Sequence, residues 1–113
     1  MIHYVRDMER AKNFYTSVFD VEPLHESPGW TTLDFGGIEL ALHMLDPGSS
    51  EPEAPIPHAG LNLEVDSIEE IQARVERSGG ILTDLREPGG GVPVRVATLR
   101  DSEGNGFELR HTP

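Results

Sequence analysis

The chain has 113 residues, of which 36% are hydrophobic and 26% are charged, and it contains no cysteine. This length fits one globular domain with a core of its own, and the missing thiols exclude a disulfide framework, a thiolate metal site and a cysteine nucleophile. Twenty acidic and nine basic residues give a net charge of −11, which argues against nucleic acid and anionic membranes as partners. No apolar run approaches the ~20 residues of a membrane span, and no secretory-signal pattern opens the chain, so a cytoplasmic location is expected.

The first part of the chain has the pattern of one helix and four strands. Residues 2–5 are a short β-prone run, and Asp7 follows as a candidate helix cap. In residues 8–20 the apolar side chains recur at i, i+3, i+4, i+7 and i+8, which predicts an amphipathic helix. Three short β-type segments follow, separated by Pro-Gly and Gly-Gly turn signals: residues 22–27, 30–35 and 38–45.

The same order of elements is expected again in the second part. Residues 47–57 are rich in proline and serine and predict a linker between module one (1–46) and module two (58–113). Residues 59–65 then alternate apolar and polar side chains as a half-buried strand, and Asp66 or Ser67 can cap a helix. Three more strands are predicted, at residues 81–86, 92–100 and 106–111.

A short repeated motif supports this duplication. Gly37-Ile38-Glu39-Leu40 opens the last strand of module one, and Gly106-Phe107-Glu108-Leu109 opens the last strand of module two. We therefore expect Glu39 and Glu108 to be related by a pseudo-twofold axis. Because a module of about fifty residues cannot bury a full core alone, the two modules should pack together into a single α+β domain, residues 1–113.

The chain resembles the vicinal oxygen chelate superfamily, which includes glyoxalase I, bleomycin-resistance proteins, fosfomycin-modifying enzymes and extradiol dioxygenases. The first segment that carries the resemblance is residues 4–15, YVRDMERAKNFY, and the second is residues 99–109, LRDSEGNGFEL. The resemblance implies two βαβββ modules whose sheets form an incomplete barrel around a cavity, with the helices outside. It does not imply one activity, because the fold hosts lyases, isomerases, dioxygenases and binding proteins.

In this family a divalent metal, such as Zn, Ni, Mn or Fe, is held by residues on the first and last strands of each module. Glu108 matches the last-strand ligand, which also makes it the candidate catalytic carboxylate, and Glu39 is its counterpart by symmetry. The ligand of the second module's first strand falls on His58 by the count of the fosfomycin-modifying enzymes. By the glyoxalase I count it falls on Gly60, which has no side chain. The family's first ligand, usually histidine, would precede Met1.

Each candidate also has an ordinary structural interpretation. Glu39 and Glu108 could be solvent-facing strand carboxylates, and His58 could be a linker histidine without a ligand. Trp30 could stack on a flat ligand in the substrate cavity, although a tryptophan is more often part of a core. His43 shares strand parity with Glu39 and is a candidate for the cavity or its rim.

Two functions stay open from the sequence. The first is a small-molecule-binding protein of the glyoxalase/bleomycin-resistance type with a degraded or incomplete metal site. The second is a divalent-metal-dependent lyase or dioxygenase that uses Glu39, His58 and Glu108. In both cases the partners are a small-molecule ligand and a second copy of the chain, because open sheet edges and the family's habit of pairing modules favour a homodimer.

Overall fold

The computed structural model describes residues 2–45 and 60–113. The linker predicted at residues 47–57 and the candidate ligand His58 lie outside these described residues.

Residues 2–45 form one helix and a four-stranded sheet, which we call the first sheet. Its strand order is β1-β4-β3-β2, with β1 parallel to β4 and the other neighbours antiparallel. The elements are β1 (Ile2–Val5), α1 (Met8–Phe19), β2 (Pro23–Glu26), β3 (Trp30–Asp34) and β4 (Glu39–Met44).

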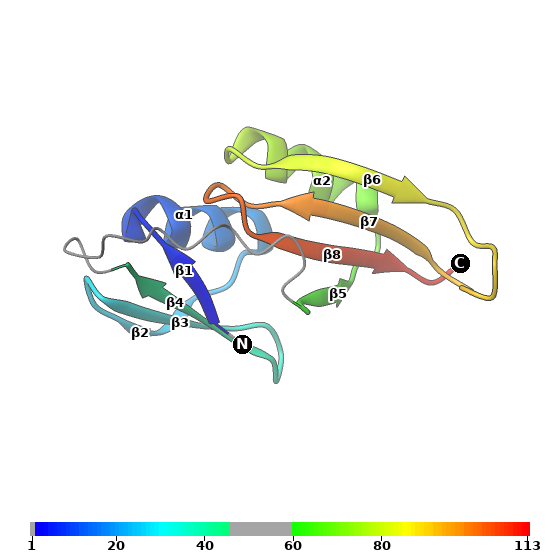
Figure 1. Ribbon diagram of the computed structural model, residues 1–113. Helices are drawn as coiled ribbons and strands as arrows, with labels where there is room; N and C mark the ends of the chain where they lie inside the picture. Colours follow the sequence, from blue (N-terminus) through cyan, green and yellow to red (C-terminus); the bar gives the residue numbers. More distant parts are fainter. Residues whose placement is uncertain (1, 46–59) are drawn as a thin grey trace.

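Residues 60–113 repeat this arrangement and form the second sheet, in the order β5-β8-β7-β6 with β5 parallel to β8. The elements are β5 (Asn62–Glu64), α2 (Ile68–Arg77), β6 (Ile81–Arg86), β7 (Arg95–Arg100) and β8 (Gly106–His111). The expected α+β fold of two tandem βαβββ modules is therefore confirmed. Both sheets are open rather than closed into a barrel (Figure 1).

Both helices begin at residues whose side chains cap the first turn. Asp7 accepts a hydrogen bond from the backbone N–H of Arg10 (3.1 Å), and Ser67 accepts one from the backbone N–H of Glu70 (3.2 Å). Each cap satisfies a backbone donor that the helix itself leaves unpaired.

Among the described residues, no helix has the length and apolar character needed to cross a membrane.

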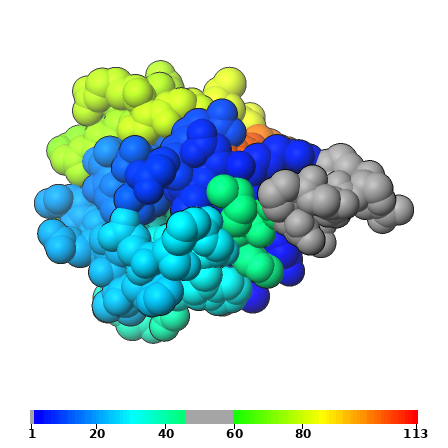
Figure 2. Space-filling model, turned by 90° about the vertical axis from the view of Figure 1, so that its left-hand side faces the viewer, coloured from blue at the N-terminus to red at the C-terminus, as the bar shows by residue number. Residues whose placement is uncertain are grey.

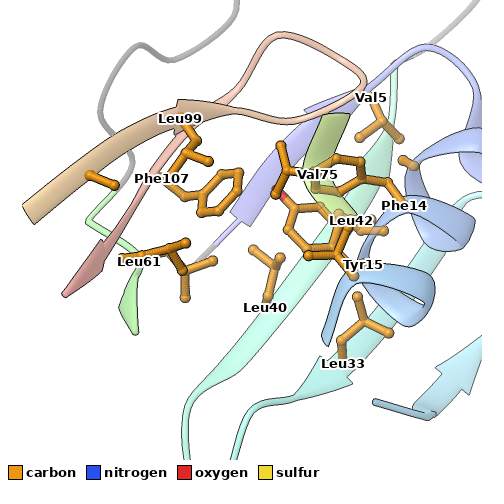
Figure 3. Packing of buried hydrophobic residues seen from close by; sticks show 14 of the residues in the cluster. Val5, Phe14, Tyr15, Leu33, Leu40, Leu42, Leu61, Val75, Leu99 and Phe107 are labelled. Atoms are coloured by element: carbon orange, nitrogen blue, oxygen red, sulfur yellow. The ribbon is translucent and has the colours of Figure 1, made fainter. Parts of the chain in front are cut away.

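One hydrophobic core runs through both modules (Figure 3). The rings of Phe14 and Tyr15 on α1 lie 6.1 Å and 6.3 Å from the ring of Phe107 on β8, measured between centroids. The helix of the first module therefore packs against the last strand of the second, and the apolar surface buried there stabilises both. Fully buried aliphatic side chains from both modules complete the core: Val5, Leu33, Leu40, Leu42, Leu61, Val75, Leu99 and Leu109.

A buried polar cluster centred on Asp101 joins the two modules. One oxygen of Asp101 accepts the backbone N–H groups of Glu103 (2.8 Å) and Asn105 (2.9 Å), which shapes the turn between β7 and β8. The other oxygen accepts the hydroxyl of Tyr15 on α1. His3 Nδ1 on β1 lies 3.2 Å from that hydroxyl. We call these five residues the Asp101 cluster.

The same turn makes further contacts with the first module. The Asn105 side-chain amide donates to the backbone carbonyl of Tyr4 (3.1 Å). The Glu103 carboxylate accepts the backbone N–H of Arg6 (2.9 Å) and the guanidinium of Arg10 (2.6 Å). Residues 99–109, the second segment that carries the family resemblance, thus contain a structural connection between the modules.

Gly80, between α2 and β6, occupies a position with no room for a side chain. A Cβ atom there would lie 2.5 Å from the Arg100 carbonyl oxygen, 2.6 Å from Val75 Cγ1 and 2.9 Å from Phe14 Cε2. All three distances are shorter than real Cβ contacts, and the first involves backbone. Glycine at this position therefore lets α2 and β6 approach the core closely.

We expect Gly80→Ala to lower the free energy of unfolding by about 1–3 kcal/mol, the usual cost of overpacking a core. Gly29→Ala is the matched control, because a Cβ at Gly29 meets nothing within 4 Å and should change stability by less than about 0.5 kcal/mol. Denaturant unfolding of both variants measures the difference. Equal stabilities would contradict the close approach at Gly80.

The buried hydroxyl of Tyr15 leads us to expect that the protein loses stability at alkaline pH. Burial raises its pKa well above the ordinary value of 10.0, and the neighbouring Asp101 carboxylate raises it further. In the unfolded chain Tyr15 loses its proton near pH 10, whereas in the folded protein it keeps it, so stability falls as the pH rises above 10. Above pH 10, we expect the free energy of unfolding to fall with pH more steeply in the wild type than in Tyr15→Phe, by up to about 1.4 kcal/mol per pH unit.

Unfolding in denaturant between pH 8 and pH 11 measures this slope. Tyr4→Phe serves as the control, since it removes the chain's other tyrosine hydroxyl and leaves the Tyr15–Asp101 hydrogen bond intact. This control should keep the wild-type slope. If Tyr15→Phe keeps it too, the buried hydroxyl does not control alkaline stability.

Candidate functional site

Each sheet has one face against the helices and the core, and we call the opposite face its open face. On β8 the side chains of Phe107 and Leu109 are buried in the core, whereas Glu108 between them is partly exposed. This follows from strand geometry, in which successive side chains point to opposite sides. Glu108 therefore lies on the open face of the second sheet.

A hollow of about 720 Å³ lies on this open face, and we call it the sheet hollow. Its volume is in the range of small-molecule sites. All of its lining residues in the described part of the chain come from module two. They include an apolar group, Val92, Val94 and Val96, and a polar group that contains Asn62, Asp84, Thr98 and Glu108.

The polar group forms one row across the second sheet. Strand pairing sets Asn62 of β5 beside Glu108 of β8, Glu108 beside Thr98 of β7, and Thr98 beside Asp84 of β6. The Asn62 amide nitrogen donates to Glu108 Oε1 at 3.2 Å. The guanidinium of Arg110 donates to the Asn62 side-chain oxygen, which orients the amide so that its nitrogen faces Glu108.

The cations near the sheet hollow are paired with acidic neighbours. Arg86 Nε lies 2.7 Å from Asp84 Oδ2, and Arg95 lies 3.0 Å from Glu87 and 2.8 Å from Glu69. The hydrogen bond from Arg95 lowers the pKa of Glu69 below its ordinary value. The hollow thus offers a ligand a polar row in which two of the four side chains are carboxylates, together with a group of valines that we call the valine wall.

The glycine-rich connection between β6 and β7 forms one edge of the sheet hollow. Gly89 and Val92 exchange two backbone hydrogen bonds of 3.0 Å, which close a tight turn. Gly90 and Gly91 occupy its two central positions with φ of 59° and 88°. Positive φ at both positions favours glycine, so the glycine run builds this turn beside the hollow.

Trp30 and His43 lie on the open face of the first sheet. They are paired across β3 and β4, with ring centroids 5.1 Å apart, and the ring of Tyr4 on β1 lies 5.3 Å from His43. Their neighbours on the same face, Thr32 and Ala41, are small and buried. The residues expected in the substrate cavity thus form an aromatic row on module one, and neither of them lines the sheet hollow.

Glu39 lies exposed at the start of β4, opposite Asp34 of β3. Glu39 is not the counterpart of Glu108 that its motif predicts, because the equivalent position lies two residues further along β4. Ile2, five residues before the cap Asp7, pairs with Ala41, whereas Asn62, five residues before the cap Ser67, pairs with Glu108. When the two modules are aligned on their helix caps, Ala41 is therefore the residue that corresponds to Glu108. A matching motif at a strand start does not specify register, which depends on the partner strands and the hairpin turn.

Sequence reasoning left out several residues of the sheet hollow, namely Asn62, Thr98, Asp84 and Arg86. One signal was present for Asn62, since the alternation of residues 59–65 puts it on the face opposite the apolar set. Gly60, the alternative ligand position, precedes β5 with a φ of 82°. His3 is fully buried in the Asp101 cluster.

The divalent metal that the resemblance implies needs several ligands that converge on one point. No group of three or more His, Cys, Asp or Glu side chains in the described part of the chain could hold a metal ion. On the paired first and last strands, module one presents Ile2 and Ala41, and module two presents Asn62 beside Glu108. A stable site needs three or four converging ligands, so the described residues by themselves do not supply the donor set of a tightly bound metal.

Comparison with known proteins identifies the family. No curated protein matches the chain. A glyoxalase/bleomycin resistance protein/dioxygenase family enzyme from Burkholderia phytofirmans PsJN shares 21% identity over 100% of this chain and 96% of its own, with a TM-score of 0.79. Lactoylglutathione lyase from Agrobacterium tumefaciens shares 19% sequence identity, and the match covers 98% of this chain and 90% of the lyase, with a TM-score of 0.72. The third similar structure is a variant of the fosfomycin resistance protein FosX from Listeria monocytogenes, solved with Mn(II) and 1S,2S-dihydroxypropylphosphonic acid. It shares 17% sequence identity, and the match covers 99% of this chain and 86% of FosX, with a TM-score of 0.72. A family model matches residues 2–109, and the chain belongs to the Glyoxalase/Bleomycin resistance protein/Dioxygenase superfamily.

Proposed function

We propose that this protein binds a small organic molecule in the sheet hollow and does so without a tightly bound catalytic metal. The proposal treats residues 1–113 as a single domain of two modules. The bound molecule would place its polar groups along the row of Asn62, Glu108, Thr98 and Asp84, and its apolar part against the valine wall.

The observation that carries this proposal is the environment of Glu108. Its direct neighbour on β5 is an asparagine that donates a hydrogen bond to it, and its neighbour on β7 is Thr98. An amide nitrogen that donates to a carboxylate cannot ligate a metal, and a threonine hydroxyl is a weak ligand compared with imidazole or carboxylate. These neighbours suit a carboxylate that recognises a hydrogen-bond donor or a cation on an organic ligand.

The metal-dependent lyase or dioxygenase with Glu39, His58 and Glu108 is the competing function. It requires carboxylates from two different sheets to converge, together with an imidazole. Glu39 and Glu108 belong to β4 and β8, which are not paired with each other. The two functions differ in how they use Glu39, so a substitution of Glu39 distinguishes between them.

We expect small organic ligands found by thermal-shift screening in a chelator-containing buffer to bind the wild type and to lose at least tenfold in affinity in Glu108→Ala. The reason is the loss of a partly buried, charge-assisted hydrogen bond, worth about 1.5–3 kcal/mol. Glu39→Ala is the matched control and should bind as the wild type does. Titration with Mn²⁺ or Ni²⁺ should give a Kd above about 0.1 mM, as in weak oxygen-ligand sites.

Elemental analysis of the purified protein completes this test. A stoichiometric divalent metal that is lost in both Glu39→Ala and Glu108→Ala, or in His58→Ala, would replace our proposal by the metal-dependent enzyme. Ligand binding that is equal in wild type and Glu108→Ala would place the site elsewhere.

We also propose a homodimer. The first sheet's open face carries the half-buried aromatic row and Ile2, which is 42% exposed, and the edge strand β6 exposes Ile81 at 58%. Both features suit a second copy of the chain, because apolar open faces and unpaired edges favour association.

Light scattering at micromolar concentration should give a mass close to twice 12.4 kDa. Ile2→Lys puts a charge on the first sheet's open face without disturbing the core, and it should shift the mass toward the monomer. A stable interface buries at least about 1,000 Å² in total, so a single buried charge is enough to weaken it severalfold. A monomeric wild type would refute the proposal.

A further inference from the structure

We propose that a second hollow, on the helix side of the first sheet, binds a small amine with an apolar body. This hollow has a volume of about 480 Å³, and none of its described lining residues lines the sheet hollow. It lies where the start of α1, the turn between β2 and β3 and the end of β4 meet, and these three segments adjoin on the face shown in Figure 2. We call it the helix hollow. The inference does not depend on the function proposed for the sheet hollow.

The walls of the helix hollow accept an apolar group. Met8 on α1, Pro28 in the β2–β3 turn and Met44 at the end of β4 contribute to its lining. Methionine side chains are flexible and polarizable, so two of them on opposite segments can adjust to ligands of different shape. Pro28 adds a rigid apolar surface between them.

The charges around the helix hollow favour a cation. Asp7, Glu9 and Glu26 contribute three carboxylates to the lining. Lys12 is one neighbouring cation, and its ammonium group is bonded to Glu26 and lies 3.1 Å from Glu9. Arg10 also interacts electrostatically with Asp7, but its guanidinium is paired with Glu103, 2.6 Å away. The described lining therefore carries three carboxylates and no cationic side chain, on a chain whose net charge is −11. A positively charged ligand is attracted by this field, and an anionic ligand is repelled.

A buried hydroxyl supplies an independent indication of a ligand. Thr31 contributes to the lining and is 0% exposed, and its Oγ1 has no hydrogen-bond partner among the described residues. A buried hydroxyl without a partner costs about 1–3 kcal/mol, and native structures rarely leave one unpaired. An N–H of an amine bound in the hollow would give this oxygen a donor, while the carboxylates balance the charge of the amine.

The chain's own methionines provide the measurement. Two of its three methionines, Met8 and Met44, line the hollow, so the ¹³C-labelled methionine methyl resonances report directly on occupancy. Met8→Leu and Met44→Leu assign the two signals. The probes are 2-phenylethylamine and its neutral counterpart 2-phenylethanol. We expect the amine to shift both signals saturably and to bind at least fivefold more tightly than the alcohol.

Three variants test the parts of this site. Glu26→Gln and Thr31→Val should each weaken the amine at least threefold, and the second variant keeps the side-chain shape. Glu22→Gln removes an equal charge from an exposed residue outside the lining and should leave the affinity unchanged. Glu108→Gln, in the sheet hollow, should also leave it unchanged.

The outcomes separate this site from the one proposed above. The proposal is overturned if the amine does not shift the methionine signals saturably, or if amine and alcohol bind equally. It is also overturned if Glu26→Gln or Thr31→Val leaves the affinity for the amine unchanged. A loss of the amine signal in Glu108→Gln would assign the binding to the sheet hollow and overturn it as well. Circular dichroism of Thr31→Val confirms that the variant is folded before its affinity is interpreted.

Discussion

The buried carboxylate of Asp101 joins segments of the chain that are 86 positions apart. A charged group inside a protein is stable only when hydrogen bonds replace the water that it loses. Asp101 receives two backbone N–H groups of its own turn and the hydroxyl of Tyr15, and His3 lies next to that hydroxyl. Because β1, α1 and the β7–β8 turn converge on this one side chain, the relative position of the two modules depends on it. The aromatic contacts of Phe14 and Tyr15 with Phe107 strengthen the same junction.

The two modules share a topology and differ in the chemistry of their open faces. At the position where module two carries Glu108 beside Asn62, module one carries Ala41 beside Ile2. Module one adds the rings of Tyr4, His43 and Trp30, whereas module two adds the polar row and the sheet hollow. The backbone of a βαβββ module does not require any of these side chains on its open face, since its stability comes from the opposite face. Duplicated modules can therefore keep one fold while their exposed surfaces take on different roles.

Much of the architecture is visible in the amino-acid sequence. The helix caps Asp7 and Ser67, the apolar periodicity of both helices and the glycine-containing turns specify the order of elements, because each signal acts between neighbouring residues. The resemblance of residues 99–109 to a family turn identifies the segment that forms the junction, and alternation along β8 indicates that Glu108 lies on the open face.

The composition of the site was decided by tertiary structure. The alternation of side chains tells which face a residue occupies, but it does not tell which residue of the next strand lies opposite. Strand register made Asn62 the partner of Glu108, set Ala41 rather than Glu39 at the equivalent position, and completed the row with Thr98 and Asp84. The burial of His3 likewise depended on α1 and the β7–β8 turn meeting at β1. The sequence by itself determined the elements and their faces, through local interactions. Which side chains meet was decided by contacts between residues far apart in the chain, and these exist only in the packed structure.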